Sequence, residues 1–401
     1  MKSYKATKIA AYIGYITQAV VNNLSPLLFV TFSQEYGLSL EKLSLLITVN
    51  FVTQILTDLF SSKYILKIGY RKACIMAHVL ATIGLLFLGI LPSVLNPFAG
   101  LMVATVFCAV GGGLDEVIIS PVIEAIPGDA KDSDMSLLHS FYSWGQMLVV
   151  LGSTAYFAIF GTDAWRVLPC IWSVIPLVCT IMFCFVPINE LPEEEGGGTY
   201  RNLFANKVFW LLFVIMICAG ASELGMSQWA SYFAEQGLGV TKYMGDLLGP
   251  CLFAFFMGIS RVIYGVWGNK IRLEGFMIVS GALCVICYFV AALAANPVIA
   301  LLGCGLCGFS VGIMWPGTYS VGTAKMPLGG TRMFALLAFA GDIGCTSGPD
   351  VVGVIAGRIG DIRKGMMFGS IFPIILIIGV CLLEIITRND LRGNDNDKKS
   401  A

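Results

Sequence analysis

Two adjacent carboxylates lie in the middle of a long apolar segment. Asp115 and Glu116 follow Gly111-Gly112-Gly113, and Pro121 comes next in the same segment. An ionisable group near the bilayer centre costs at least ~2.5–3.5 kcal/mol, so it is expected to face a cavity, a partner or a proton path. Burial and a like charge both disfavour an ionised carboxyl, which can then exchange a proton near neutral pH. Successive helical residues point about 100° apart, so only one of the two carboxylates should face a cavity. The glycines should let a neighbouring helix approach closely.

Other charged residues interrupt apolar segments elsewhere in the chain. Glu223 and Asp342 are further candidates for proton coupling, although helix packing is an equally good interpretation of Asp342. Asp58 and Arg261 occupy equivalent positions in two segments, and we interpret them as structural or gating charges. The sequence does not tell whether these two residues pair with each other.

The first apolar segment carries a face of amides. Gln18, Asn22 and Ser25 are spaced i, i+4, i+7, which places them on one side of a helix. Such side chains can recognise hydroxyl groups of a substrate, or they can hydrogen-bond between helices for less than ~1 kcal/mol per contact. Asn23 points to another side, toward residues 97–126 or the edge of a pore. We predict that Gln18, Asn22 and Asn23 bind substrate.

A second polar stripe crosses residues 134–161. His139, Tyr142, Ser143 and Gln146 share one helical face, with spacing i, i+3, i+4, i+7. Imidazole titrates near neutral pH, so His139 could share a proton with Glu116. The alternative is that Asp115 or Glu116 forms a structural pair with His139 or Arg261. We predict that His139, Tyr142 and Gln146 line the substrate cavity.

The second half of the chain supplies aromatic residues beside polar ones. Aromatic rings suit the apolar face of a sugar, while amides and carboxylates bind its hydroxyls. The alternative is an aromatic belt at the membrane interface, which fits Tyr232 better than the tryptophans. The predicted binding residues of this half are Gln228, Trp229, Trp315 and Tyr319.

The sequence offers no set of residues for catalysis. It has two histidines, in different segments, and no P-loop for ATP. Cys284-x-x-Cys287 and Cys304-x-x-Cys307 have the spacing of a zinc site, but thiolates in apolar surroundings without polar neighbours favour plain packing. We expect no enzyme activity, no cofactor and no metal.

The composition is that of a polytopic membrane protein. Of 401 residues, 57% are hydrophobic and only 12% charged, against roughly 25% charged in soluble domains. No basic run suggests nucleic-acid binding. Apolar stretches long enough to cross a bilayer fall at about 9–33, 42–65, 73–93, 97–126, 134–161, 165–187, 207–235, 243–268, 273–294, 297–324, 332–357 and 364–387.

These segments divide into two similar halves. Gly37-Leu38-Ser39-Leu40-Glu41-Lys42 recurs as Gly237-Leu238-Gly239-Val240-Thr241-Lys242, and Pro127 matches Pro327 at the same offset. We therefore predict two pseudo-symmetric six-helix bundles, with substrate between them near mid-membrane. The predicted parts are a bundle at 1–187, a cytoplasmic linker at 188–206, a bundle at 207–387 and a disordered cytoplasmic tail at 388–401.

The loop charges predict the orientation. With both termini inside, eighteen Lys and Arg residues lie on the inner side and six on the outer side. Positively charged loops stay in the cytoplasm. Both termini are therefore expected to be cytoplasmic.

The chain resembles the major facilitator superfamily over nearly its whole length. Lys67-Ile68-Gly69-Tyr70-Arg71-Lys72 resembles the end of that family's basic loop motif, with Leu66 where the motif has Asp. Asn22-Asn23-Leu24, Glu116 before Pro121 and the stretch from Ser136 to Gly145 resemble the fucose–galactose–glucose:proton symporter branch. Pro26 stands where that branch has an acid. The resemblance implies the major facilitator fold, an all-α integral membrane protein, and selects Glu116 as the proton carrier.

Taken together, these patterns predict a secondary active transporter that takes up a sugar or polyol with protons by alternating access. The alternative is an exporter of hydrophobic or cationic compounds that uses the same acids, which the amide-rich first segment disfavours. A membrane sensor would carry a soluble signalling domain, which is not seen. Sodium is a possible coupling ion, because carboxylates and amides also suit a hard cation. We expect a monomer in a cell membrane, and a chain with such short tails suggests a bacterial inner membrane.

Overall fold

The computed structural model describes residues 4–127, 131–189, 200–267, 272–326 and 330–400. The chain is helical along nearly all of this length, and the described residues form no strand. Most of the predicted linker, including Glu193-Glu194-Glu195, lies outside the described residues.

The described residues of the first half form eight helices and a short 3-10 turn. Long apolar helices predominate, as expected where every backbone N–H and C=O must be satisfied without water. They are α1 (Lys5–Leu27), α2 (Phe29–Tyr36), α3 (Leu40–Ile68), α4 (Tyr70–Val94), α5 (Pro97–Glu124), α6 (Lys131–Phe160), η1 (Thr162–Ala164), α7 (Val167–Trp172) and α8 (Val174–Phe185).

The second half repeats this order of long helices after the short α9 (Tyr200–Ala205). Its helices are α10 (Lys207–Ser227), α11 (Ala230–Tyr232), η2 (Phe233–Gly237), α12 (Lys242–Asp246), η3 (Leu247–Cys251), α13 (Leu252–Trp267), α14 (Leu273–Leu293), α15 (Pro297–Val311), α16 (Met314–Lys325), α17 (Gly330–Ile359), α18 (Ile362–Gly369) and α19 (Ile371–Ser400).

These helices account for the twelve predicted segments. Within the described residues, ten spans are long and apolar enough to cross a membrane, and the pair α1 and α2 adds an eleventh that bends by 43°. The twelfth segment is α17, which is as long but carries Asp342, Asp350 and Arg358. The predicted all-α fold is therefore confirmed.

The two halves share local features at nearly the same offset in the sequence. Asn96 caps α5 through Ala99 N and Asn296 caps α15 through Val298 N, each just before a proline at the first helical position. Glycines with positive φ directly follow corresponding long helices, Gly161 after α6 and Gly360 after α17. The halves are therefore repeats in structure as well as in sequence.

A related interruption falls at the same point of each repeat. α1 breaks at Leu28, two residues after Pro26, whose ring removes a backbone donor. α10 breaks at Gln228 and Trp229. Breaks at equivalent places in two halves commonly mark the substrate path of a transporter.

The glycine triplet lets α5 approach three helices at once. A Cβ on Gly111 would lie 2.7 Å from Ala81 N in α4, and one on Gly112 would lie 3.1 Å from Val21 Cγ2 in α1. A Cβ on Gly113 would lie 3.1 Å from Gln54 Cα in α3. The close approach predicted from these glycines is confirmed, and it brings Asp115 and Glu116 into the centre of the first bundle.

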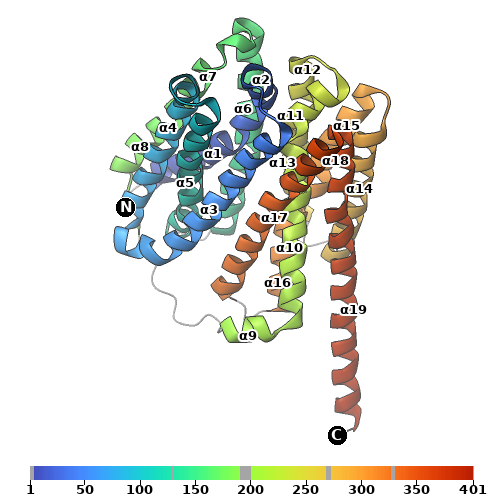
Figure 1. The fold of residues 1–401 in the computed structure, drawn as a ribbon. Helices are drawn as coiled ribbons and strands as arrows, with labels where there is room; N and C mark the ends of the chain where they lie inside the picture. Colours follow the sequence, from blue (N-terminus) through green and yellow to red (C-terminus); the bar gives the residue numbers. More distant parts are fainter. Residues whose placement is uncertain (1–3, 128–130, 190–199, 268–271, 327–329, 401) are drawn as a thin grey trace.

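The halves meet along two helix pairs, α3 with α17 and α6 with α13. Figure 1 shows the two groups of helices lying together at the end that holds α2 and α12, and diverging toward the end that holds α9. From the distribution of Lys and Arg, the α2 and α12 end is the outer end. The end that holds α9 is correspondingly the inner end.

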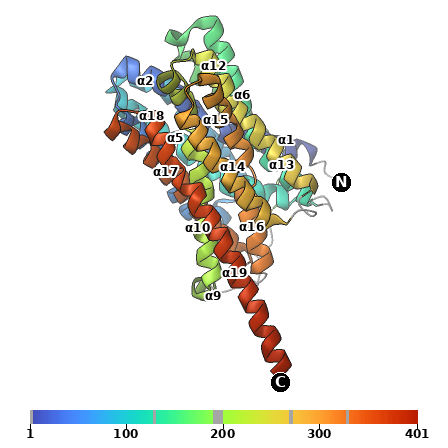
Figure 2. The same ribbon diagram turned by 90° about the vertical axis from the view of Figure 1, so that its right-hand side faces the viewer.

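The C-terminal tail differs from the expectation of disorder. α19 continues as a helix to Ser400, and Figure 2 shows it projecting beyond the bundle. Residues 388–400 contain no proline. A helix already nucleated in the membrane extends one hydrogen bond per residue, so the polar sequence can prolong it.

Candidate functional site

Glu116 faces the interior of the first bundle from α5. Its Oε2 accepts a hydrogen bond of 2.8 Å from Gln18 Nε2 on α1. One turn further along α5, Ser120 Oγ lies 2.8 Å from the Tyr15 hydroxyl. The predicted proton carrier is therefore held by an amide, which permits either protonation state more readily than a fixed cation would.

Asp58 and Asp342 join the two halves beside Glu116. The Asp58 carboxyl on α3 interacts with the Asp342 carboxyl on α17, and both interact electrostatically with Glu116. Asp58 was interpreted from sequence as a structural or gating charge, separate from the coupling acids. The structure instead brings Asp58, Asp342 and Glu116 into one acidic cluster, which we call the central acids.

The fourth coupling candidate, Glu223 on α10, lies with a cation. Arg261 Nη2 on α13 is 3.7 Å from Glu223 Oε2, and Arg261 Nη1 donates to Ser143 Oγ on α6 at 3.0 Å. Arg261 thus pairs with Glu223 rather than with Asp58. This group crosses the second interface between the halves, because α6 and α13 belong to different halves.

Asp115 points away from the central acids. Its Oδ1 lies 3.3 Å from His78 Nδ1 on α4, and both side chains are fully buried. His78 Nδ1 also lies 2.8 Å from the Cys74 carbonyl oxygen. The structure therefore separates the adjacent carboxylates as expected from their angular spacing, with Glu116 toward the other half and Asp115 inside its own bundle.

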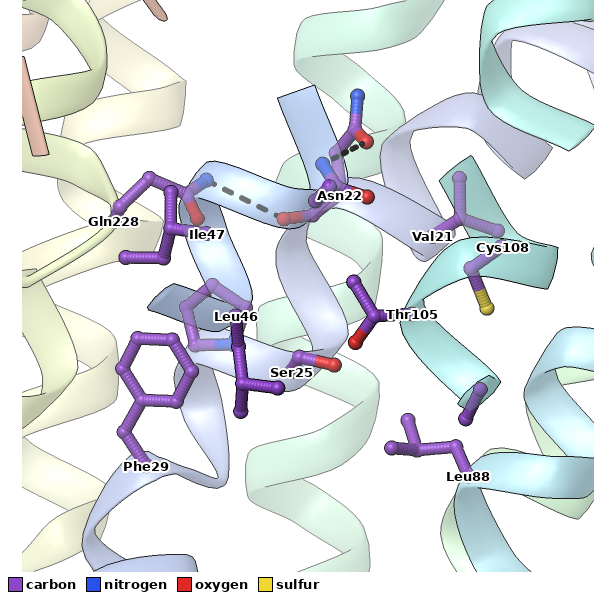
Figure 3. Close-up of a pocket in the computed structure, with 13 residues that line it drawn as sticks. Val21, Asn22, Ser25, Phe29, Leu46, Ile47, Leu88, Thr105, Cys108 and Gln228 are labelled. Carbon is purple, nitrogen blue, oxygen red and sulfur yellow. Dashed lines mark hydrogen bonds between the residues drawn. The ribbon is translucent and has the colours of Figure 1, made fainter. Parts of the chain in front are cut away.

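An amide cluster lies one turn outward from Gln18. Asn22 Oδ1 accepts hydrogen bonds from Gln54 Nε2 at 2.8 Å and Asn50 Nδ2 at 3.2 Å, both on α3. Gln228 Nε2 of the other half donates to the Asn22 carbonyl oxygen at 3.3 Å, as Figure 3 shows. Asn22 and Gln228 were predicted binding residues, and the structure brings them together across the interface.

Sequence reasoning missed Asn50 and Gln54, although a signal was present. Asn50, Gln54 and Asp58 are spaced i, i+4, i+8, so they form one polar stripe along α3. Because the apolar run around them is long, the segment was interpreted only as a span. The same stripe test that identified His139 and Gln146 would have found it.

The cavity beside this cluster is small. It is lined by Asn22, Ser25, Phe29, Thr105 and other residues (Figure 3), and its volume is about 20 Å³. A volume of roughly 10–15 Å³ accommodates one water molecule, so no sugar fits there in this conformation. The outer part of the predicted substrate path is therefore closed.

The polar stripe on α6 contacts α1 of its own half and α13 of the other half. His139 is exposed although it lies within a span, and its ring packs edge-on against Tyr15, with centroids 5.2 Å apart. The Tyr142 hydroxyl accepts a 3.4 Å hydrogen bond from Asn23 Nδ2. Asn23 therefore faces α6, not α5. Gln146 is buried.

The predicted aromatic residues separate into two groups. Trp229 is fully buried and donates from Nε1 to the Pro349 carbonyl oxygen at 3.0 Å, which places it in packing at the outer end. Trp315 packs on Gly341, next to Asp342. Tyr319 is half-buried and interacts electrostatically with Asp342. Trp315 and Tyr319 thus lie by the central acids, whereas Trp229 does not.

The outer end is closed by a second charged group. Lys242 Nζ lies 3.1 Å from Asp246 Oδ2, and it donates at 2.7 Å to the Leu27 carbonyl oxygen of the other half. Asp246 Oδ1 accepts from Ser231 Oγ at 2.5 Å, and Lys242 lies over the ring of Phe157 of α6, 5.2 Å from its centroid. We call Lys242, Asp246 and Ser231 the outer cluster.

The structure also bears on the four cysteines. Cys284 Sγ on α14 and Cys307 Sγ on α15 lie 3.7 Å apart, and all four side chains are buried. Within the described residues, no group of three or more His, Cys, Asp or Glu side chains is arranged to hold a metal ion.

Comparison with known proteins identifies the family. The family model described as Major Facilitator Superfamily matches residues 11–349. The chain belongs to the major facilitator superfamily. It is therefore a multi-pass membrane transporter and not an enzyme, as predicted.

Solved structures of other superfamily members share this fold at low sequence identity. A D-xylose-proton symporter has a TM-score of 0.77 at 13% identity, with 95% of this chain and 97% of that chain covered. A bacterial homolog of the human lysosomal transporter Spinster, in an inward-facing and occupied conformation, has a TM-score of 0.74 at 14% identity, with 96% and 97% covered.

The E. coli fucose:proton symporter has a TM-score of 0.66 at 15% identity, with 95% of this chain and 99% of that chain covered. No curated protein sequence matches this transporter. At these identities the structural likenesses establish the fold, and the cargo must be argued from the site.

Proposed function

We propose that this transporter is a proton-coupled symporter that takes up a sugar or polyol by alternating access. The observation that carries the proposal is the 2.8 Å contact between Glu116 Oε2 and Gln18 Nε2, inside the membrane and facing the other half. A carboxyl group held by a neutral amide in a water-poor site can bind a proton without breaking an ion pair.

The groups around Glu116 favour a hydroxylated cargo. Amides from both halves, among them Gln18 and Gln228, offer donors and acceptors that match sugar hydroxyls. Trp315 and Tyr319 lie by Asp342 and supply rings for the apolar face of a sugar. Similar fold members include xylose:proton and fucose:proton symporters, which is consistent with such a cargo.

We interpret this conformation as inward-facing, with the outer end closed. The outer cluster closes one end, while His139 of the first half is exposed and Arg261 of the second half is partly exposed. We propose that substrate and proton leave through this inner space, and that the protein resides in a bacterial inner membrane.

The test is uptake into proteoliposomes of labelled sugars and polyols, with and without an inward proton gradient, for the native protein and Glu116→Gln. We expect one sugar class to accumulate only with the gradient. Glu116→Gln should abolish accumulation while keeping exchange of labelled for unlabelled sugar, because the amide retains the shape but carries no proton.

Two results would contradict the proposal. If Glu116→Gln accumulates sugar as the native protein does, Glu116 is not the proton carrier. If no sugar moves, the cargo assignment is wrong. Proton-driven efflux of a cationic dye would then favour the exporter, in which the central acids bind a cation.

A further inference from the structure

Four cysteines of the second half lie at the interface between α14 and α15. Cys284 and Cys287 belong to α14, Cys304 and Cys307 belong to α15, and all four side chains are buried. Cys284 Sγ lies 3.7 Å from Cys307 Sγ. The two helices are consecutive membrane spans and run antiparallel, so one turn toward the outer end brings Cys287 level with Cys304. The register therefore stacks two thiol pairs, and the inner pair is in direct contact.

The two helices approach each other closely at this depth because small residues line their interface. A Cβ on Gly303, the residue before Cys304, would lie 2.8 Å from Val290 Cγ1 and 3.1 Å from Ala291 N on α14. A disulfide needs Cα atoms within about 7 Å of each other and a bond of about 2.05 Å between the sulfur atoms. The sulfur atoms of the inner pair would have to approach by less than about 2 Å, a shift that side-chain rotation can supply.

The surroundings of the inner pair leave its thiols free for chemistry with each other. The neighbouring polar side chain on α14 is Tyr288, and its hydroxyl donates to the Ser222 carbonyl oxygen on α10 at 2.9 Å. The 3.7 Å contact of Cys284 with Cys307 is the hydrogen bond that the two sulfur atoms form with each other. Buried cysteines commonly serve only as small apolar residues, and a contact between two thiols on neighbouring helices goes beyond that role.

The interface is reached from the lipid. Ile286 and Leu306, each next to one of these cysteines in the sequence, have exposed side chains, and both helices are long and apolar enough to cross a membrane. Glutathione, which keeps cytosolic thiols reduced, is charged and enters the hydrocarbon only at a high cost. A lipid-soluble oxidant enters it freely. The pair is therefore separated from the cytosolic reductant and accessible to oxidants that form in the bilayer.

We propose that Cys284 and Cys307 are an oxidation site, at which a lipid hydroperoxide converts the two thiols into a disulfide that links α14 to α15. One sulfur attacks the peroxide, the O–O bond breaks, and a sulfenic acid and an alcohol form. The second thiol attacks the sulfenic sulfur, the S–S bond forms, and water leaves. Two electrons pass from the sulfur atoms to the peroxide, and the two thiol hydrogens end in the alcohol and the water.

The link joins two parts of the second bundle that are held by different neighbours. Tyr288 bonds α14 to α10, whereas α15 packs on α13, where a Cβ on Gly308 would lie 2.0 Å from the Phe253 carbonyl oxygen. A disulfide between α14 and α15 restricts the unfolded chain and so stabilises the folded one. The oxidised transporter should therefore melt at a higher temperature than the reduced one. This inference depends neither on the cargo nor on the coupling ion.

The test oxidises the full chain in proteoliposomes with cumene hydroperoxide, a lipid-soluble hydroperoxide. The protein is then denatured, its remaining thiols are alkylated, and its mass and linked peptides are measured. We expect two fewer alkylated cysteines than the thirteen of the reduced protein, and a peptide that joins residues 284 and 307. The exposed Cys184 reports that the oxidant has reached the protein. Oxidation of Cys184 without the 284–307 link would overturn the inference.

Alanine variants identify the two sulfur atoms. Cys284→Ala and Cys307→Ala should each lose the link and the rise in melting temperature, whereas Cys287→Ala should keep both. Cys381→Ala, at a half-buried cysteine on α19, is the matched control and should behave as the native protein does. Monodispersity and the melting temperature of the reduced form show that each variant is folded. A link that persists in Cys284→Ala would assign the disulfide to another pair and overturn the inference.

Two reductants test the access from the lipid. Tributylphosphine, which is lipid-soluble, should restore the thiols in intact proteoliposomes, and glutathione should leave the disulfide in place. Equal rates of reduction by the two compounds would overturn the proposed access. None of these measurements uses a transported substrate. A failure of sugar uptake therefore contradicts the proposed function alone, and a missing link contradicts the oxidation site alone.

Discussion

The outer cluster and the central acids are two charged regions that differ in burial and in partners, because the outer cluster is buried whereas Glu116 and Asp58 are partly exposed. In the outer cluster, Lys242 lies 3.1 Å from Asp246, and the pair is also bonded to backbone and hydroxyl groups. Among the central acids, Glu116 accepts a hydrogen bond from an amide, and Asp58 has the carboxyl group of Asp342 as its neighbour. A carboxylate with a buried cation keeps its charge, whereas one with a neutral partner can change it. The comparison suggests that one region fixes a conformation and the other responds to protons.

The largest effect on the difference between the two regions is expected when the cation of the outer cluster is removed. Lys242→Met leaves Asp246 buried without its cation, which destabilises such a site by about 3–5 kcal/mol. We expect the outer end to open. The measurement is the distance between spin labels at Thr162 and Arg358, which are exposed and lie on opposite halves, and this distance should increase. Uptake should fall because the inward-facing state becomes rare.

The double variant Lys242→Met/Asp246→Asn is the matched control, because it removes the cation together with its fully buried partner; Glu235, whose Oε1 lies 3.3 Å from Lys242 Nζ, is more exposed. It should recover most of the closed population. A Lys242→Met protein that stays closed at the outer end would show that the ion pair does not hold this conformation.

A smaller effect is expected in the amide cluster between the two regions. Asn22→Leu leaves the donors of Asn50 and Gln54 without their acceptor, and an unsatisfied buried polar group costs about 1–3 kcal/mol. We expect KM for the transported sugar to rise about tenfold, which corresponds to roughly 1.4 kcal/mol.

The control for this prediction is Asn296→Ser, which keeps a capping side chain on α15 at a site far from the amides. Its KM should match that of the native protein. An unchanged KM in Asn22→Leu would show that the amide cluster is structural. Its amides would then hydrogen-bond between helices and would not bind substrate.

The smallest effect is expected at Asp115, which is compared with its neighbour Glu116 on the same helix, α5. Asp115 and Glu116 are adjacent in sequence, but Asp115 contacts His78 inside its own bundle. Asp115→Asn should therefore change proton-driven uptake by less than about twofold, since the amide can still pair with the imidazole. Accumulation in the proteoliposome assay checks this. Loss of accumulation as severe as in Glu116→Gln would place Asp115 on the proton path.

Much of the fold was predictable because membrane helices are dictated by composition. Long apolar runs and the loop charges predicted the spans, and the matched glycines and prolines predicted the repeat. The break of α1 at Leu28 was not predicted, although Pro26 was visible, because a proline within a span can either kink or end a helix. Helicity beyond residue 388 was likewise missed, since polar composition alone suggested disorder.

The site was predictable as a set of residues but not as a set of partners. Angular spacing separated Asp115 from Glu116, yet it could not assign them to His78 and Gln18. Those pairings depend on how α4 and α1 pack around the glycine triplet. The meeting of Asp58 with Asp342 depends on the docking of two halves, which no local pattern within one helix encodes.

The bend at the end of α1 has a consequence for the solvent. The Leu27 carbonyl oxygen accepts its hydrogen bond from Lys242, a residue of the opposite half. When the outer end opens, that backbone oxygen and the ammonium group must both be hydrated, so opening takes up water molecules that closure releases. The equilibrium between the two forms should thus depend on water activity, and solutes too large to enter the outer opening should act as osmotic inhibitors of the transport cycle.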